Sequence, residues 1–317
     1  MERLELFTEH RIRWNDEICA KVRQTVIDNR FKNLSGWAEN GEEGYAREID
    51  SHTWHRHDST IQYIVPWVNQ VFPLAGTKIV EVGCGTGSST AAFAKFVDVV
   101  YGYDISKHSV EGAKARLLVH GLDTKAEFVA TPPAELLSYI DNQHDDASVD
   151  IFLLFAVLEH QTIEERLETL TLAKRLVRPG GVIVICETPN RLTYFDHHTA
   201  QMPFFHMLPH DLQAIVAAQS PRKHFRTNIA QFTSQDRSRD EVEEHLTRWG
   251  ATVSFHEFDL VFEDFDSRVL TSGCHPNLMK LRPEEPEEEA LRQYMKAINL
   301  ERHEGFTRYY LDFVIAN

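Results

Sequence analysis

Three glycines, Gly83, Gly85 and Gly87, alternate with other residues in the segment VEVGCGTGSST. An apolar run precedes them and small hydroxyl residues follow, which is typical of a strand that turns into a helix. Glycine has no side chain, so a ligand can approach the main chain of such a turn closely, where the N–H groups of the helix N-terminus lie unpaired. The turn therefore predicts a binding site for the polar end of a nucleotide-like ligand.

The spacing and the nearby acids narrow the class of ligand. The dinucleotide fingerprint G-x-G-x-x-G would need glycine where the chain has Ser88, and no Gly-Lys-Ser or Gly-Lys-Thr follows, as a P-loop would require. Asp104 ends the next predicted strand, where a carboxylate can accept hydrogen bonds from both hydroxyls of a ribose. Glu81 beside the turn favours an ammonium group over a phosphate. S-adenosylmethionine has a ribose, an ammonium, a sulfonium and no phosphate, so it is the cofactor that we expect.

Methyl transfer from a sulfonium to a hydroxyl needs alignment of the acceptor and a group that removes its proton. Histidine suits this task because its unperturbed pKa is near 6.5. His160 follows the buried strand VDIFLLFAV, at the sheet edge where ligands of open α/β sheets bind. We predict His160 and His198 as catalytic residues, with His160 as the base or as a ligand of the acceptor. The alternative is that His160 braces the following helix.

The segment from Pro189 to Gln213 combines aromatic and polar residues directly after a predicted strand. Aromatic walls with a few polar groups suit a pocket for a sugar or similar polyol. The alternative is a lid whose aromatic residues pack on the sheet. The residues that we predict to bind the acceptor are Asn190, Arg191, Tyr194, His206 and His210.

Two histidine groups have spacings that could suggest a metal site. His206 and His210 are four residues apart, but Pro209 between them disfavours a shared helical face. The segment HTWHRH has three histidines, at 52, 55 and 57, but it lacks a motif with a carboxylate partner. We therefore predict no metal site.

Short β-branched runs alternate with segments of helical period from Lys78 onward, which predicts parallel strands with crossover helices. Capping boxes at Thr162/Glu165 and Ser238/Glu241 predict helix starts. Further strands are predicted at 251–261 (ATVSFHEFDLV) and 306–316 (FTRYYLDFVIA). We expect an N-terminal helical cap at 1–72 and a domain at 73–317, with inserted lid segments at about 188–235 and 262–305.

Composition excludes several classes of function. The 317 residues carry 33 Lys and Arg against 48 Asp and Glu, and this formal charge of −15 disfavours nucleic acid as a partner. No stretch has the roughly 20 apolar residues of a membrane span, and the charged start of the chain is unlike a signal peptide. The four cysteines form no C-x-x-C pair, so we expect reduced thiols. These features predict a cytoplasmic protein and leave its oligomeric state open.

Four motifs, in order, resemble the class I S-adenosylmethionine-dependent methyltransferases with methyltransferase domains of types 11 and 23. They are VEVGCGTG, the acid Asp104 after a second strand, VDIFLLFAVLEH, and LVRPGGVIVICETPN. The resemblance covers about Lys78 to Asn190 and extends to the helix and two strands after Ser238. It implies an α/β, doubly wound, mostly parallel, seven-stranded Rossmann-like sheet.

The resemblance also implies which residues bind S-adenosylmethionine. The turn Gly83–Gly85 faces the methionine portion, Glu81 interacts with the ammonium through the loop or a water, Asp104 holds the ribose and Ile105 flanks the adenine. Where the family often has an acid for the adenine amino group, this chain has ATPPAELL, so Glu135 or backbone groups would read the base. The predicted cofactor-binding residues are Glu81, Gly83, Cys84, Gly85, Gly87, Asp104, Ile105, Glu135 and Phe155.

The expected function is O-methylation of a small hydroxylated acceptor such as a sugar or glycan. The alternatives are an N-methyltransferase, a quinone or polyphenol O-methyltransferase, or a cofactor-binding partner subunit without catalytic activity. A dehydrogenase is disfavoured by the glycine spacing.

Overall fold

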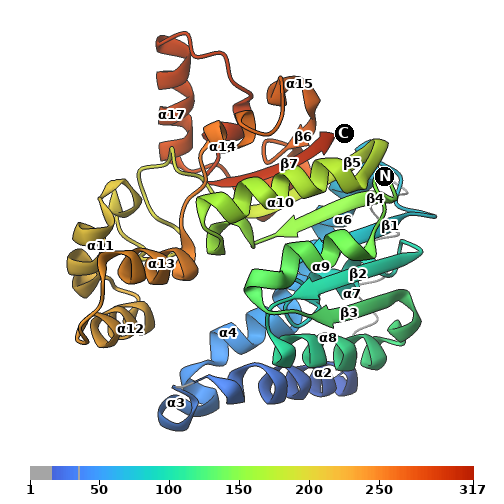
Figure 1. Ribbon diagram of the computed structural model, residues 1–317, viewed down its shortest axis with the longest axis horizontal. Helices are drawn as coiled ribbons and strands as arrows, with labels where there is room; N and C mark the ends of the chain where they lie inside the picture. The colour runs from blue at the N-terminus through green and yellow to red at the C-terminus, as the bar shows by residue number, and fades with distance from the viewer. Residues whose placement is uncertain (1–15, 35) are drawn as a thin grey trace.

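The computed structural model describes residues 16–34 and 36–317, so residues 1–15 and 35 of the predicted cap lie outside the described part. Seven strands form one sheet in the order β3-β2-β1-β4-β5-β7-β6, and β7 is the antiparallel strand among them (Figure 1). This confirms the predicted seven-stranded, mostly parallel, Rossmann-like sheet. The strands are β1 (Lys78–Val82), β2 (Val99–Asp104), β3 (Ala126–Ala130), β4 (Val149–Phe155), β5 (Val177–Pro189), β6 (Val269–Ser272) and β7 (Tyr310–Ala316).

Helices cover both faces of the sheet, so alternate side chains of its strands enter two separate cores. In β1, Val80 and Val82 pack with α9 (Leu136–Gln143) and α10 (Ile163–Leu176). Ile79 packs on the other face with the apolar residues of α6 and α7. The remaining helices of the central region are α6 (Val65–Val71), α7 (Ser88–Phe93) and α8 (Lys107–His120). Both faces are therefore closed, as a parallel sheet requires.

Local helix signals in the sequence are confirmed. The Thr162 and Ser238 side chains accept hydrogen bonds from the N–H groups of Glu165 and Glu241, and each Glu bonds back to the cap. These capping boxes begin α10 and α13 (Arg239–Gly250). Pro66 lies in the first turn of α6, a position that proline tolerates.

The predicted strand at 251–261 is wrong. The segment forms the short helix α14 (Phe255–Asp259), and Val253 makes one isolated bridge to Asn190. The reason is a capping box at Ser254 and Glu257, which begins a helix that buries Phe258 in the core. The sixth strand is β6 instead, within the segment 262–305 that we expected to be an insertion.

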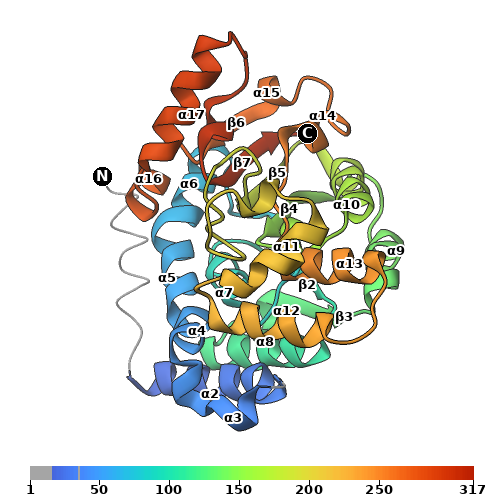
Figure 2. The ribbon, with the colours of Figure 1, turned by 90° about the vertical axis from the view of Figure 1, so that its left-hand side faces the viewer.

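The two predicted lid segments contain helices and contact each other. Figure 2 shows α11, α12 and α13 in front of the sheet, beyond the carboxyl ends of its parallel strands. Glu287 on α17 joins the lids, because it accepts hydrogen bonds from the Phe195 N–H (3.0 Å) and from His197 (2.7 Å). The lid helices are α11 (His210–Val216), α12 (Lys223–Thr233), α15 (Phe265–Arg268), α16 (Pro276–Leu281) and α17 (Pro286–Ala297).

The N-terminal cap is helical in its described part, as predicted, and it lies against the glycine turn. The fully buried Arg116 of α8 donates to the carbonyls of Thr86 in the turn and of His52 and Thr53 in the cap. Ser88 Oγ also donates to the His52 carbonyl at 2.9 Å. The cap helices are α2 (Asp16–Asn29), α3 (Trp37–Gly44), α4 (Ala46–Asp50) and α5 (Arg56–Ser59). Within the described residues, no helix is long and apolar enough to cross a membrane.

Replacing Arg116 with Met is expected to lower the free energy of unfolding by about 2–4 kcal/mol, because three buried carbonyls lose their donor. Lys114→Ala is the control, since Lys114 is exposed on the same helix and its change should stay within about 0.5 kcal/mol. Urea denaturation followed by circular dichroism measures both. Equal stability of the two variants would show that Arg116 does not join the cap to the turn.

Candidate functional site

The three glycines of the turn all have left-handed backbone, with φ of 73° at Gly83, 53° at Gly85 and 74° at Gly87. An added Cβ at Gly83 would meet Val157 at 2.8 Å, and one at Gly87 would meet Ala113 at 3.0 Å. At Gly85 nothing lies within 4 Å of such a Cβ. The turn is thus packed from behind and open at its middle glycine, which suits close approach of a ligand there.

Asp104 is held at the edge of this opening. Its Oδ2 accepts the Gly85 N–H and its Oδ1 accepts the Ser106 N–H, each at 2.8 Å. Ser106 caps α8, so Asp104 itself is not the helix cap. Because each carboxylate oxygen has two lone pairs, both oxygens of Asp104 can still accept a ribose hydroxyl.

Glu81 faces the helix rather than the open side of the turn. Its carboxylate is fully buried and accepts hydrogen bonds from the hydroxyls of Ser89 and Thr90. Burial raises the pKa of Glu81 to about 7, against the effect of these two hydrogen bonds. In this arrangement it orders the first turn of α7, and the loop stands between it and a ligand.

The side chains expected near the adenine differ in exposure. Ile105 is 55% exposed, which leaves its side chain free to cover a base. Glu135 is exposed in a 3-10 turn. Thr131, whose N–H donates to the Asp104 carbonyl, has a buried hydroxyl without a hydrogen-bond partner among the described residues. The Thr131 hydroxyl is therefore a third candidate for reading the base, which sequence reasoning missed.

Two further predicted cofactor residues, Cys84 and Phe155, also have buried side chains. The Cys84 side chain lies in the core, and burial raises the pKa of its thiol. Only the main chain of Cys84 can therefore contact a ligand. Phe155 ends β4 and its ring lies 5.2 Å from the guanidinium of Arg56. These features together fit an adenosyl group linked to a short polar chain. They are the open glycine turn, the Asp104 carboxylate with both oxygens able to accept, and the exposed Ile105.

A carboxylate and two histidines meet beyond the end of β4. Glu159 and His160 lie in a 3-10 turn (Leu158–His160), and His198 comes from the first lid segment. Glu159 Oε1 lies 3.8 Å from Nε2 of both His160 and His198. One ligand atom from each of the three residues lies within 4.8 Å of the other two. Within the described part of the chain, no other group of three His, Cys, Asp or Glu side chains is as close.

The outer nitrogens of both rings are engaged, which fixes their tautomers. His160 Nδ1 lies 3.0 Å from the Arg248 carbonyl, which can only accept, so Nδ1 carries the proton. His198 Nδ1 lies 3.0 Å from the Thr199 hydroxyl, which itself donates to the Gly250 carbonyl and so accepts from the ring. Both Nε2 atoms therefore present lone pairs toward Glu159.

Burial governs the charge of this cluster. It raises the pKa of Glu159 to about 8, while it lowers the pKa of His160 to about 4 and that of His198 to about 3. Nearby arginines add to the effect on the histidines, among them Arg56 and Arg222. At neutral pH both imidazoles are therefore neutral.

Backbone contacts hold His198 firmly in place. The buried Asp196 carboxylate accepts the N–H groups of His198, Thr199 and Ala200 at 2.7–3.0 Å. Arg222 donates to the His198 carbonyl at 2.7 Å. Gly250 gives the ring its space, because a Cβ there would lie 2.4 Å from His198 Nδ1.

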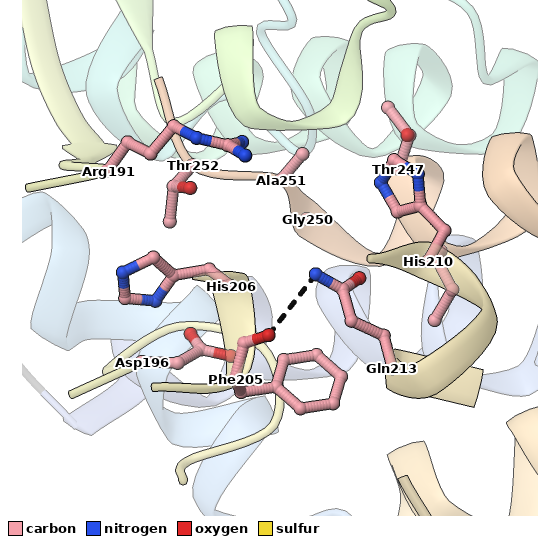
Figure 3. Close-up of a pocket in the computed structure, with 11 residues that line it drawn as sticks. Arg191, Asp196, Phe205, His206, His210, Gln213, Thr247, Gly250, Ala251 and Thr252 are labelled. Carbon is pink, nitrogen blue, oxygen red and sulfur yellow. Dashed lines mark hydrogen bonds between the residues drawn. The ribbon is translucent and has the colours of Figure 1, made fainter. Parts of the chain in front are cut away.

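A small hollow lies beside this cluster, between the first lid segment and α13. Figure 3 shows Arg191, His206 and His210 among the residues that line it, and they come from different sides. The structure thus brings together three of the five residues predicted to bind an acceptor. Gly250 is shared, since it lines the hollow and contacts His198.

The other two predicted acceptor residues lie elsewhere. Asn190 is buried and donates to the carbonyls of Phe306 and Arg308, so it holds the lids to the sheet. Tyr194 packs on Phe204 with ring centroids 6.0 Å apart. The histidines at 52, 55 and 57 diverge, since His55 is exposed while His57 is buried against His120.

Sequence reasoning missed the charged residues that surround the cluster. Arg56 pairs with Glu187 at 3.0 Å, and Glu187 pairs with Arg282 at 3.1 Å. Arg282 in turn pairs with the buried Asp312 at 2.6 Å. No local pattern marks these residues, because they come from the cap, the end of β5, the second lid and β7.

Comparison with known proteins agrees with the geometry of the glycine turn. A family model described as a methyltransferase domain matches residues 80–185. A ubiquinone biosynthesis O-methyltransferase from Cupriavidus pinatubonensis is 31% identical over 39% of this chain and 46% of its own length. A 27-O-demethylrifamycin SV methyltransferase from Amycolatopsis mediterranei is 28% identical over 47% of this chain and 51% of its own. The chain thus matches about half the length of these relatives.

Among solved structures, S-adenosylmethionine-bound CalS10, an amino pentose methyltransferase from Micromonospora echinaspora, is 21% identical. The match covers 45% of this chain and 55% of the CalS10 chain, with a TM-score of 0.36. The segment that matches the methyltransferase-domain model, residues 80–185, contains the glycine turn, Asp104, Glu159 and His160, and it ends within β5. Residues 80–185 thus match a methyltransferase domain, which supports the resemblance to the class I S-adenosylmethionine-dependent methyltransferases.

Proposed function

We propose that the protein transfers a methyl group from S-adenosylmethionine to a hydroxyl oxygen of a small acceptor. The observation that carries the proposal is the placement of the Glu159–His160–His198 cluster beside the glycine turn. Val157 packs against Gly83, and Glu159 follows two residues later. The donor and the cluster are thus neighbours at the carboxyl edge of the sheet.

The chemistry of the cluster favours oxygen as the methylated atom. An alcohol attacks poorly at neutral pH unless a nearby group withdraws its proton, whereas a neutral amine attacks unaided. The two imidazoles, whose Nε2 atoms carry no proton, lie beside the Glu159 carboxyl group and can accept this proton. We infer that these three side chains activate the acceptor's hydroxyl.

A sugar or another polyol is the acceptor that we favour. Arg191 and His210 line the neighbouring hollow and carry groups that can hydrogen-bond the hydroxyls of an acceptor. The relatives include proteins named as quinone and rifamycin O-methyltransferases, so a polyphenol or quinol is the second candidate. A glycan, as opposed to a free sugar, would have to enter between the lids.

Methyl incorporation tests the proposal directly. The purified chain is incubated with methyl-labelled S-adenosylmethionine and three acceptor panels, namely free and oligomeric saccharides, polyphenols and quinols, and amines. We expect label in a methyl ether of a hydroxylated acceptor. Label only in amines would favour the N-methyltransferase alternative, and cofactor binding without any transfer would favour a partner subunit.

Asp104→Ala is expected to weaken S-adenosylmethionine binding by about 2 kcal/mol, or about 30-fold in Kd, because two charge-assisted hydrogen bonds to the ribose are lost. Isothermal titration of the purified variants measures the affinity. Glu135→Gln is the matched comparison, since Glu135 is exposed and its neutral amide keeps an acceptor oxygen. An unchanged affinity of the Asp104 variant would contradict the ribose role.

His160→Ala and His198→Ala are each expected to lower kcat by about a hundredfold or more while the Kd for S-adenosylmethionine stays the same. The reason is that both imidazoles belong to the Glu159 cluster, whereas the glycine turn and Asp104 are the predicted sites of cofactor contact. His55→Ala is the control, because His55 is an exposed histidine of the cap. Steady-state rates that match the control would move the activating group elsewhere.

A further inference from the structure

We propose that Glu159, His160 and His198 bind a divalent transition-metal ion that holds the acceptor's hydroxyl and makes it more acidic. This inference rests on the proposed function and assigns the two histidines the role of metal ligands. Nothing in the sequence pattern suggested such a site, because its third ligand comes from a segment 38 residues after His160.

The unpartnered carboxylate is the first reason. Glu159 is fully buried, and neither of its side-chain oxygens has a hydrogen-bond partner among the described residues. A buried carboxylate needs a cation or strong donors to offset the loss of water. A proton alone would not satisfy it, since both facing imidazole nitrogens lie 3.8 Å away, beyond hydrogen-bond distance.

The separation of the three ligand atoms is the second reason. They lie within 4.8 Å of one another without touching, so a space is left between them. Bonds of about 2.1 Å to one ion would bring such atoms to roughly 3.0–3.4 Å apart. The two 3.8 Å contacts would shorten by less than about 1 Å, and the two histidine nitrogens, which lie within 4.8 Å of each other, would shorten by less than about 2 Å, a range that side-chain rotations can supply.

The surroundings of the histidines are the third reason. Metal-binding histidines characteristically donate the other ring nitrogen to a carbonyl, carboxylate or similar acceptor, which fixes the lone pair on the metal side. His160 does so to the Arg248 carbonyl, and His198 does so to the Thr199 hydroxyl. The main chain of His198 is held by Asp196 and Arg222, so its ligand atom is positioned before any ion arrives.

The ligand types indicate the kind of ion. Two imidazole nitrogens and one carboxylate suit Mn²⁺, Fe²⁺, Co²⁺ or Zn²⁺, whereas Mg²⁺ and Ca²⁺ prefer oxygen ligands. Three protein ligands leave at least one position open, as in catalytic rather than structural metal sites. The open position would take the acceptor's oxygen.

The transfer step balances without a further reactant. A metal-bound hydroxyl is more acidic than a free one and gives its proton to water. Its oxygen then forms a bond to the methyl carbon while the carbon–sulfur bond breaks, with that electron pair remaining on sulfur. The products are a methyl ether, S-adenosylhomocysteine and a proton.

Cobalt binding to the full-length chain tests the site without using activity. The protein is treated with EDTA and dialysed, and Co²⁺ is then titrated while visible absorption and metal content are followed. We expect one tightly bound Co²⁺ per chain with ligand-field bands, displaced by Zn²⁺ and not by Mg²⁺. Binding of Mg²⁺ instead of Co²⁺ would overturn the assignment to a transition metal.

Variants locate the ion at the cluster. Glu159→Gln and His198→Gln should each weaken Co²⁺ binding about a hundredfold or more, and His55→Ala should bind like the unaltered protein. Glu159→Gln replaces an unpartnered buried carboxyl group with a neutral group of nearly the same shape, so the variant should fold, which circular dichroism verifies. If both cluster variants bind Co²⁺ as tightly as His55→Ala does, the site is refuted.

The outcomes separate this inference from the proposed function. Stoichiometric Co²⁺ binding that depends on Glu159 and His198 supports the site even if no acceptor is methylated. Full methyl transfer by the EDTA-treated protein, with no loss on added chelator, refutes the metal's role while the proposed function stands.

Discussion

The parallel direction of β1, β2 and β4 is the constraint on which the candidate site depends. Because these strands run the same way and are paired in register, the segments that follow them leave the sheet at one edge. Gly83, Asp104 and Glu159 come from three distant parts of the chain and meet there for this reason. The glycine turn, the acid at Asp104 and Glu159 are thus placed by the sheet itself, and the first lid segment adds His198.

Local signals allowed much of this architecture to be predicted from the sequence. The glycine turn, the acid at Asp104 and two capping boxes each act within a few residues, so their geometry follows from short-range sterics and hydrogen bonding. The strand predicted at 251–261 was wrong because an unrecognised capping box at Ser254 outweighed its alternating apolar pattern.

The contacts between distant segments could not be predicted in the same way. His198 reaches Glu159 only because Asp196 gathers three N–H groups and Gly250 leaves room for the ring. Neither condition has a signature in the sequence near His198. The same holds for Arg56, which comes from the cap to pair with Glu187 at the end of β5. Such residues become visible only once the sheet has placed their partners.

The position of Arg116 between the cap and the glycine turn has an energetic consequence. Since one guanidinium binds carbonyls on both sides, an arrangement of the turn that weakens its bond to Thr86 also loosens His52 and Thr53. A small molecule that orders the turn must then tighten the packing of the cap, and linkage requires the reverse effect to be equal in free energy. The packing of the N-terminal helices would therefore change when a ligand binds the glycine turn, although these helices do not form the turn.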